Sequence, residues 1–258
     1  MSAAISVVLP AYNAASEIEA TVKALTAFFE QRGVDGEVVV ADDGSRDGTA
    51  DAVPSGPGVV VVRLSANRGK GAAIRAGMER ATGDIRAFTD ADLPYGTEPL
   101  LLAERYIGER GFHAVVGDRT LPGSSYQHEG LLRRSVSEVA SFTFRTLVTG
   151  GIYDTQCGFK AFRGDVADEL FRIARIDGFA IDVELIYLLL KYRLDIKRIP
   201  VRLRYNAGSS VRVVRDSARA ATDILKMRAN WARGAYHSPG LDEILVTETG
   251  SGISETGA

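Results

Sequence analysis

The chain has 258 residues, of which 45% are hydrophobic and 25% are charged, and its formal net charge at pH 7 is -2. This composition is that of an ordinary globular protein with enough apolar residues for a sizeable core. Because Lys and Arg are not in excess, the composition argues against a general nucleic-acid binder, and any basic site must be local. The single cysteine, Cys157, excludes an internal disulfide and a cysteine-based metal site, which favours a reducing compartment.

Strand and helix patterns alternate along the first half of the chain. Compact apolar runs predict strands over residues 5–10, 37–41 and 59–64, and a fourth that starts at Ile85 and leads into two aspartates. Helices are expected over residues 15–31, with Gly33 as the stop, and from residue 67 onwards. This alternation predicts an α/β fold built on a doubly wound parallel sheet with right-handed crossovers.

Polar segments follow each of these four strands, at residues 10–13, 42–43, 67–70 and 90–92. Ligands of doubly wound sheets bind beyond the carboxyl ends of the strands. Turn chemistry explains each segment alone, but it does not require repeated acids at the ligand end. Two carboxylates one residue apart, Asp90 and Asp92, can share a divalent cation that holds a nucleotide diphosphate. No Gly-X-Gly-X-X-Gly follows the first strand and no Walker lysine motif is present, which argues against a dehydrogenase or a phosphate-loop ATPase.

Four motifs resemble, in order, those of family 2 glycosyltransferases with the GT-A fold: Val-Val-Leu-Pro-Ala-Tyr-Asn, Asp-Asp-Gly-Ser-Arg-Asp-Gly-Thr, Asn-Arg-Gly-Lys-Gly-Ala-Ala and Thr-Asp-Ala-Asp-Leu. Residues 154–162 and 179–185 resemble polyprenyl or dolichyl phosphate sugar transferases, and among them the dolichyl-phosphate β-glucosyltransferase branch. The resemblance implies a Rossmann-like, mostly parallel sheet with flanking helices. It also implies one domain over residues 1–236, with a nucleotide-sugar half (1–120) and an acceptor half (121–236). Residues 237–258, small and polar towards their end, are expected to form a disordered tail.

The same resemblance assigns the donor site. The residues implied in nucleotide binding are Pro10, Ala11, Tyr12, Asn13, Glu17, Asp42, Asp43, Lys70, Asp90 and Ala91. Asp90 and Asp92 would bind Mg²⁺ or Mn²⁺, which neutralises charge on the departing diphosphate. Arg204 and Ser209, in a Gly/Ser-containing loop, would fold over the donor.

The acceptor residues implied are Arg119, Arg133 or Arg134, and Ser135 at the start of a helix expected over 133–149. A guanidinium donates two parallel hydrogen bonds to phosphate oxygens. A phosphate monoester, whose second pKa is ~6, is already largely dianionic near neutrality and needs no catalytic base. A hydroxyl acceptor would need a base, and Asp154, Asp182 and Glu184 are the three residues proposed for it.

The resulting hypothesis is an inverting glycosyltransferase that moves glucose from UDP-glucose to a polyprenyl phosphate. GDP-mannose as donor, and a soluble enzyme acting on a hydroxyl of a small molecule or glycan, are the alternatives. A sugar-nucleotide-binding regulator without turnover is disfavoured by the intact Asp90 and Asp92.

Membrane contact is left open by the sequence. The longest apolar run, residues 185–190, is too short to span a bilayer, and the sequence lacks the spanning helices that many such transferases carry after the catalytic domain. The expected location is cytoplasmic, either free or peripheral on the cytoplasmic membrane face. A basic amphipathic helix over residues 211–236, carrying Trp231, is expected either to dock on its own domain or to lie on an anionic membrane face.

Overall fold

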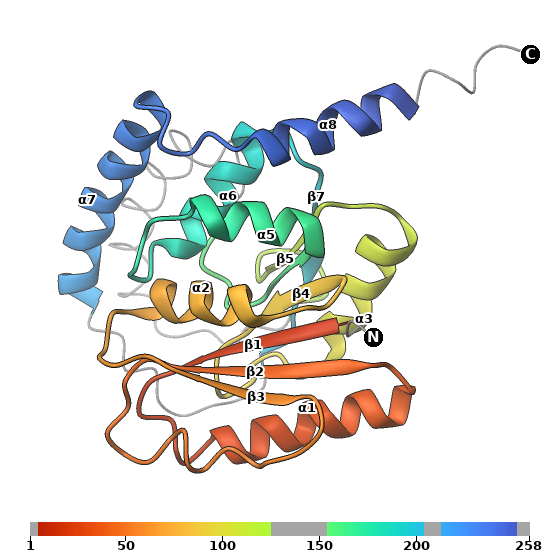
Figure 1. The fold of residues 1–258 in the computed structure, drawn as a ribbon, viewed down its shortest axis with the longest axis vertical. Coiled ribbons are helices and arrows are strands. Elements are labelled where there is room, and N and C mark those ends of the chain that lie inside the picture. The colour runs from red at the N-terminus through yellow and green to blue at the C-terminus, as the bar shows by residue number, and fades with distance from the viewer. Residues whose placement is uncertain (1–4, 125–153, 204–212, 252–258) are drawn as a thin grey trace, which may run out of the picture.

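The structure is a computed structural model that describes residues 5–124, 154–203 and 213–251. Its centre is a seven-stranded sheet with the order β3-β2-β1-β4-β6-β5-β7 (Figure 1). The strands are β1 (Ile5–Ala11), β2 (Gly36–Asp42), β3 (Val59–Arg63), β4 (Ile85–Phe88), β5 (Ala114–Asp118), β6 (Lys160–Arg163) and β7 (Ile196–Pro200). The four strands expected in the first half of the chain are confirmed.

The sheet is mostly parallel, with one strand reversed. β1 runs parallel to β2 and β4, β2 to β3, and β5 to β7. β6 is antiparallel to both of its neighbours, β4 and β5. Consequently Lys160, the first residue of β6, pairs with Phe88, the last residue of β4. The residues just before β6 are therefore brought to the carboxyl end of β4.

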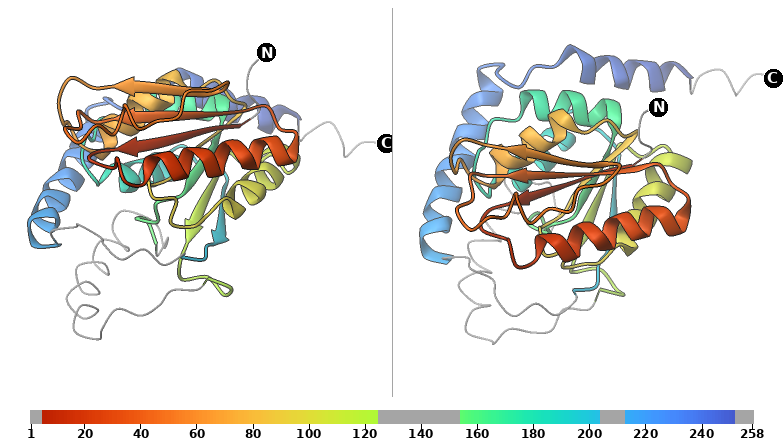
Figure 2. Two further views of the ribbon diagram at one scale, coloured as in Figure 1. Left: turned by 90° about the horizontal axis from the view of Figure 1, so that it is seen from below. Right: turned by 60° about the horizontal axis from the view of Figure 1, so that its bottom comes forward.

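Helices cover both faces of the sheet (Figure 2). They are α1 (Ile18–Arg32), α2 (Lys70–Arg80), α3 (Glu98–Ala103), the π-helical turn η1 (Glu104–Glu109), α5 (Gly164–Ile173), α6 (Ile181–Lys191), α7 (Val213–Ala232) and α8 (Pro239–Ser251). Alternate strand residues point to opposite faces, so Val7 packs in a core with α1, α3 and η1, whereas Val8 packs in a core with α2, α5 and α6. Both faces of β1 are buried, as its continuous apolar run predicts.

Helix ends follow local backbone requirements. Gly33 ends α1 in the left-handed conformation, with φ 62°, and its N–H donates to the Glu30 and Phe29 carbonyls. This confirms the predicted stop, because glycine adopts positive φ without steric cost. β7 ends at Pro200, since proline has no N–H to extend the ladder.

The chain beyond α6 packs on the domain. Trp231 of α7 makes edge-on ring contacts with Tyr187 and Tyr192, with centroids 6.1 and 5.7 Å apart. In α8, Leu241 is buried, so the prediction of a disordered tail from residue 237 is wrong for residues 239–251. The physical reason is that the apolar Leu241 and the contact of α8 with α5 bury part of this helix against the domain. No helix in the described part of the chain is both long and apolar enough to cross a membrane.

Candidate active site

The carboxyl ends of β1, β2 and β4 lie side by side at one edge of the sheet. Ala11 pairs with Asp42, and the N–H of Asp43 donates to the Ala11 carbonyl at 2.8 Å. Pro10 and Ala11 thus form the strand end itself. Tyr12 follows and is 49% exposed. Its ring offers an apolar face at the edge where the family resemblance implies nucleotide binding.

The loops after β1 and β2 are joined by hydrogen bonds. Asn13, at φ 53°, accepts from the Arg46 N–H at 3.0 Å, and its own N–H donates to Ser45 Oγ at 2.9 Å. Asp42 accepts from the Ser45 N–H at 2.9 Å. Asn13 and Asp42 therefore both hold the loop after β2 at residues 45–46. Glu17 is exposed at the start of α1.

Asp43 holds the start of α2. Its two carboxylate oxygens accept from the N–H groups of Arg68 and Gly69, each at 2.8 Å. Gly69 has φ 113°, a conformation suited to glycine, and a Cβ there would press on the Asp177 carbonyl. Asp43 thus fixes the loop that presents Lys70.

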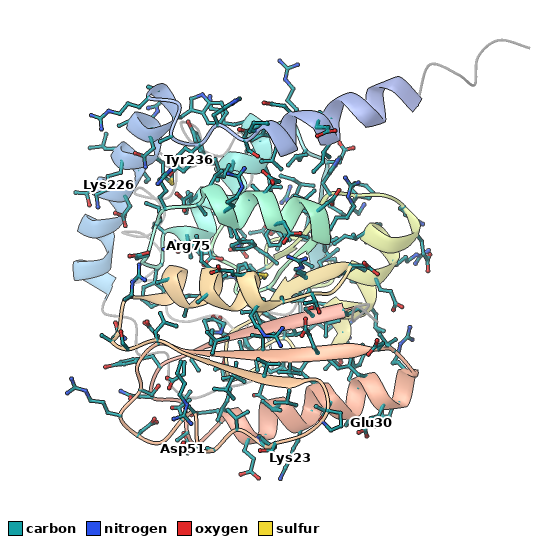
Figure 3. The ribbon with its side chains drawn as sticks, viewed as in Figure 1. Lys23, Glu30, Asp51, Arg75, Lys226 and Tyr236 are labelled. Carbon is teal, nitrogen blue, oxygen red and sulfur yellow. The ribbon has the colours of Figure 1, made fainter. Side chains whose placement is uncertain are left out.

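The loop before α6 clamps the same end of α2. The Gly71 N–H donates to the Asp177 carbonyl at 2.7 Å, and Arg75, labelled in Figure 3, donates to the Ile176 carbonyl at 2.6 Å and to the Asp177 carboxylate. These contacts join the start of α2 to residues 176–177. They explain why residues more than 100 positions apart share one site.

Lys70 lies between two carboxylates. Its ammonium donates to Asp90 at 2.6 Å and lies 3.7 Å from Asp182. Burial alone would lower the pKa of Lys70, but the negative charges of Asp182 and Asp90 outweigh it and raise this pKa above its ordinary value. Lys70 therefore stays a fixed positive charge at the rim, close to where the diphosphate is expected.

Asp90 and Asp92 follow β4 in a tight turn. The Leu93 N–H donates to the Asp90 carbonyl at 2.9 Å, and the Ala91 carbonyl accepts from Thr21 of α1 at 2.7 Å. Asp92 is exposed, and the Asp90 side chain is 39% exposed. A Cβ at Gly158 would overlap the Asp90 carboxylate, so glycine leaves that carboxylate its space.

This pair of oxygen donors fits a hard divalent cation. Within the described residues no group of three or more His, Cys, Asp and Glu side chains could hold a metal by itself. Two protein carboxylates, with remaining positions left to substrate phosphates and water, are the usual arrangement for Mg²⁺ at a nucleotide site. The metal ligands Asp90 and Asp92 stay a prediction.

Arg119 is held by Asp154. The backbone N–H and Nε of Arg119 each donate to Asp154 Oδ2 at 2.8 Å, and Nη2 donates to Oδ1 at 2.8 Å. Burial raises the pKa of Asp154, but the hydrogen bonds and charge of Arg119 outweigh it and hold this pKa below its usual range. The Arg119 side chain remains 32% exposed. Asp154 therefore orients a guanidinium that ligands can still reach.

The other two carboxylates proposed as a base have partners within the chain. Asp182 binds the ammonium of Lys160 and faces Lys70. Glu184 is 0% exposed and accepts from the Arg175 and Ile176 N–H groups, each at 3.0 Å, and from the Tyr236 hydroxyl. Burial raises the pKa of Glu184, and its hydrogen bonds offset this only in part. Glu184 thus ties the segment before α6 to the chain after α7.

Five predicted residues, Arg133, Arg134, Ser135, Arg204 and Ser209, lie outside the described residues. Two residues that the sequence analysis did not assign, Gly158 and Lys160, reach the site because β6 is antiparallel. The available signal was a lysine inside the otherwise apolar segment Cys157–Phe162, since a buried lysine requires a carboxylate partner.

The family model of glycosyl transferase family 2 matches residues 6–171, which is more than half of the chain. The chain belongs to glycosyltransferase family 2. The match contains every motif of the donor side, from the β1 end through Asp92 to the segment before β6. As a member of this family, it is an enzyme that transfers a sugar.

Relatives and solved structures agree with this assignment. The dolichyl-phosphate β-glucosyltransferase of Dictyostelium discoideum is 27% identical over 90% of this chain and 76% of its own length. Mannosyl-3-phosphoglycerate synthase from Rubrobacter xylanophilus superposes with a TM-score of 0.67 at 21% identity, over 92% of this chain and 78% of that one. Glucosyl-3-phosphoglycerate synthase from Mycobacterium tuberculosis, crystallised with Mn²⁺, UDP-glucose and phosphoglyceric acid, gives 0.66 at 21% identity over 87% and 79%. These likenesses confirm the expected GT-A fold.

Proposed function

We propose that this glycosyltransferase moves glucose from UDP-glucose to the phosphate of a polyprenyl phosphate, with inversion at the anomeric carbon. Relatives named dolichyl-phosphate β-glucosyltransferase, matched over 90% of the chain, support the donor sugar and the acceptor class. The structural observation that carries the proposal is the pairing of Arg119 with Asp154 at the end of β5.

This pairing favours a phosphate acceptor over a hydroxyl. A base must have a carboxylate oxygen available to the proton that it removes. Both oxygens of Asp154 accept hydrogen bonds from Arg119, and its lowered pKa makes it a poor proton acceptor. The same pairing suits an arginine that must present its charge to an acceptor phosphate in one orientation.

Asp182 and Glu184 point to the same conclusion. Asp182 is bound between two lysine ammonium groups, and Glu184 has no exposed surface through which an acceptor hydroxyl could reach it. A phosphate dianion attacks the anomeric carbon without a base, so the enzyme has to position the reactants and stabilise the leaving group. The contacts of the three carboxylates fit that simpler requirement.

On the donor side, Tyr12, Asn13, Asp42 and Asp43 would hold the nucleotide, and Lys70 would lie beside the diphosphate. Asp90 and Asp92 would hold Mg²⁺ or Mn²⁺, which when bound supplies positive charge to the leaving diphosphate. The acceptor is a membrane lipid, so we propose that the enzyme works in peripheral contact with a membrane surface. Arg133 or Arg134 would complete the phosphate site with Arg119.

The direct test is transfer of radiolabelled glucose from UDP-glucose to a short-chain polyprenyl phosphate with Mn²⁺. We expect label in the lipid fraction, and its loss in Asp92→Ala. GDP-mannose, with labelled mannose, and phosphoglyceric acid serve as the competing donor and acceptor. Label transferred only from GDP-mannose would replace the donor assignment, and label on phosphoglyceric acid but not on lipid would replace the acceptor assignment.

Asp154→Asn separates the two acceptor chemistries. If Asp154 orients Arg119, its loss should raise the KM for polyprenyl phosphate, by about 100-fold for a misplacement near 1 Å. Slow hydrolysis of UDP-glucose in the absence of lipid should continue, because the donor site is intact. If Asp154→Asn instead binds polyprenyl phosphate like wild type but transfers no glucose, Asp154 acts in the chemical step, as a base would, and does not orient Arg119.

A further inference from the structure

A buried ammonium lies directly behind the donor site. Lys160, the first residue of β6, is 1% exposed. Its ammonium donates to the Asp182 carboxylate and, at 3.0 Å, to the Cys157 carbonyl, and it lies 5.5 Å from the centre of the Phe88 ring. A lysine is rarely buried this completely, because removing its charge from water is costly unless a carboxylate pairs with it.

Asp182, the partner of Lys160, also lies near Lys70 at the ligand end of the sheet. Asp182 Oδ1 binds Lys160, and Oδ2 lies 3.7 Å from the ammonium of Lys70. Lys70 in turn donates to Asp90 at 2.6 Å. Four side chains of alternating charge thus run from the core to the surface, in the order Lys160, Asp182, Lys70, Asp90.

Lys70 lies closer to Asp90 than to Asp182. Its ammonium is within hydrogen-bond distance of Asp90 but only within ion-pair distance of Asp182. Asp182 is 3% exposed, so its charge needs a close cation, and Lys160 provides that cation. Without Lys160, the nearest remaining ammonium would be that of Lys70, and Asp182 would draw it away from Asp90.

The backbone around Lys160 reinforces this arrangement. Gly158, two residues before Lys160, lies against the Asp90 carboxylate, where any Cβ would overlap it. Lys160 donates to the carbonyl of Cys157, the residue just before Gly158. The segment from Cys157 to Lys160 therefore contacts Asp90 directly through Gly158 and indirectly through Asp182 and Lys70.

We propose that Lys160 is a positioning residue of the donor site, which holds Asp182 so that Lys70 stays on Asp90. The inference rests on the proposed role of Asp90 in binding the donor. Lys160 itself touches no substrate. Its effect is to set where the positive charge of Lys70 lies and in which direction the Asp90 carboxylate points.

The test measures binding of UDP-glucose with Mn²⁺ by titration calorimetry in wild type, Lys160→Met and Lys160→Met/Asp182→Asn. Lys160→Met should weaken binding by about 10–100-fold, the range typical for residues that orient a metal ligand. The double variant should bind several-fold more tightly than Lys160→Met, because asparagine does not compete for Lys70. This rescue is the signature that a purely structural lysine would not give. If Lys160→Met does not fold, the double variant, which removes both buried charges, is compared with wild type instead: donor affinity near that of wild type supports the proposal, and affinity about 10–100-fold weaker overturns it.

The matched control is Arg86→Met, which removes another nearly buried cation, paired with Asp168. It should lower the melting temperature and leave donor affinity unchanged. The inference is overturned if Lys160→Met binds like wild type, or if the folded double variant binds no better than Lys160→Met. Because binding of the donor needs no acceptor, a wild-type enzyme that binds UDP-glucose but labels no polyprenyl phosphate would overturn the acceptor assignment alone.

Discussion

At the scale of single residues, Gly158 tests the position of the Asp90 carboxylate. A methyl group at residue 158 would occupy the place of that carboxylate, which would have to turn away from Lys70. Because the displaced group is the end of a side chain and not backbone, the fold should survive. We expect Gly158→Ala to keep its melting temperature near that of wild type and to lose roughly 100-fold in kcat/KM for donor hydrolysis.

Gly56→Ala is the control for this prediction, since a Cβ there meets no atom within 4 Å. It should leave donor hydrolysis unchanged. If a well-folded Gly158→Ala hydrolysed the donor at the wild-type rate, the observed position of the Asp90 carboxylate would not matter for this reaction. In that case the segment before β6 would have no part in the donor site.

At the scale of elements, β6 shows the limit of reading strands from sequence. The first four strands are apolar runs with polar residues after them, a pattern that fixes both the strand and the end that meets the ligand. β6 is four residues long, and no local sequence pattern predicts that it pairs antiparallel between β4 and β5. Its direction is set by tertiary pairing, so Lys160 and Gly158 could not be placed at the site beforehand.

Also at this scale, Glu184 of α6 joins the segment before α6 to the chain after α7. One of its oxygens accepts from Arg175 and Tyr236, and the other accepts from Ile176. A glutamine has only one acceptor oxygen, so its amide N–H₂ group would face one of these donors. Glu184→Gln should therefore cost about 1–3 kcal/mol of unfolding free energy. Below its melting temperature, kcat should be unchanged.

Thermal unfolding measures this cost, at about 2–4 °C for each kcal/mol in a domain of this size. Glu79→Gln, an exposed glutamate on α2, should stay within about 0.5 kcal/mol of wild type. If Glu184→Gln instead kept full stability and lost kcat, Glu184 would act in catalysis and the hydroxyl acceptor would regain support.

At the scale of the whole molecule, the sequence predicted the architecture better than the joining of its two halves. Alternating strands and helices are local patterns, and they were sufficient for the α/β sheet and for the edge carrying Asp42, Asp43 and Asp90. The contacts of Arg75 with residues 176 and 177 join distant segments and have no local pattern. For the same reason the partners of Asp154 and Asp182 could not be predicted from the sequence. Because the argument for a phosphate acceptor depends on those partners, it could not be made from the sequence either.

The C-terminal helix α8 carries the final prediction at this scale. Leu241 is 0% exposed and belongs to the same core as α2, α5 and α6, and Ser238 just before α8 donates to Glu169 of α5. Leu241→Ala should therefore cost about 2–5 kcal/mol of unfolding free energy, as expected for a leucine removed from a packed core. Leu225→Ala on α7, where the leucine is 68% exposed, should stay within about 0.5 kcal/mol of wild type in the same denaturant titration. Equal stability of the two variants would mean that α8 adds nothing to the core, and the domain would then end, as the sequence predicted, near residue 236.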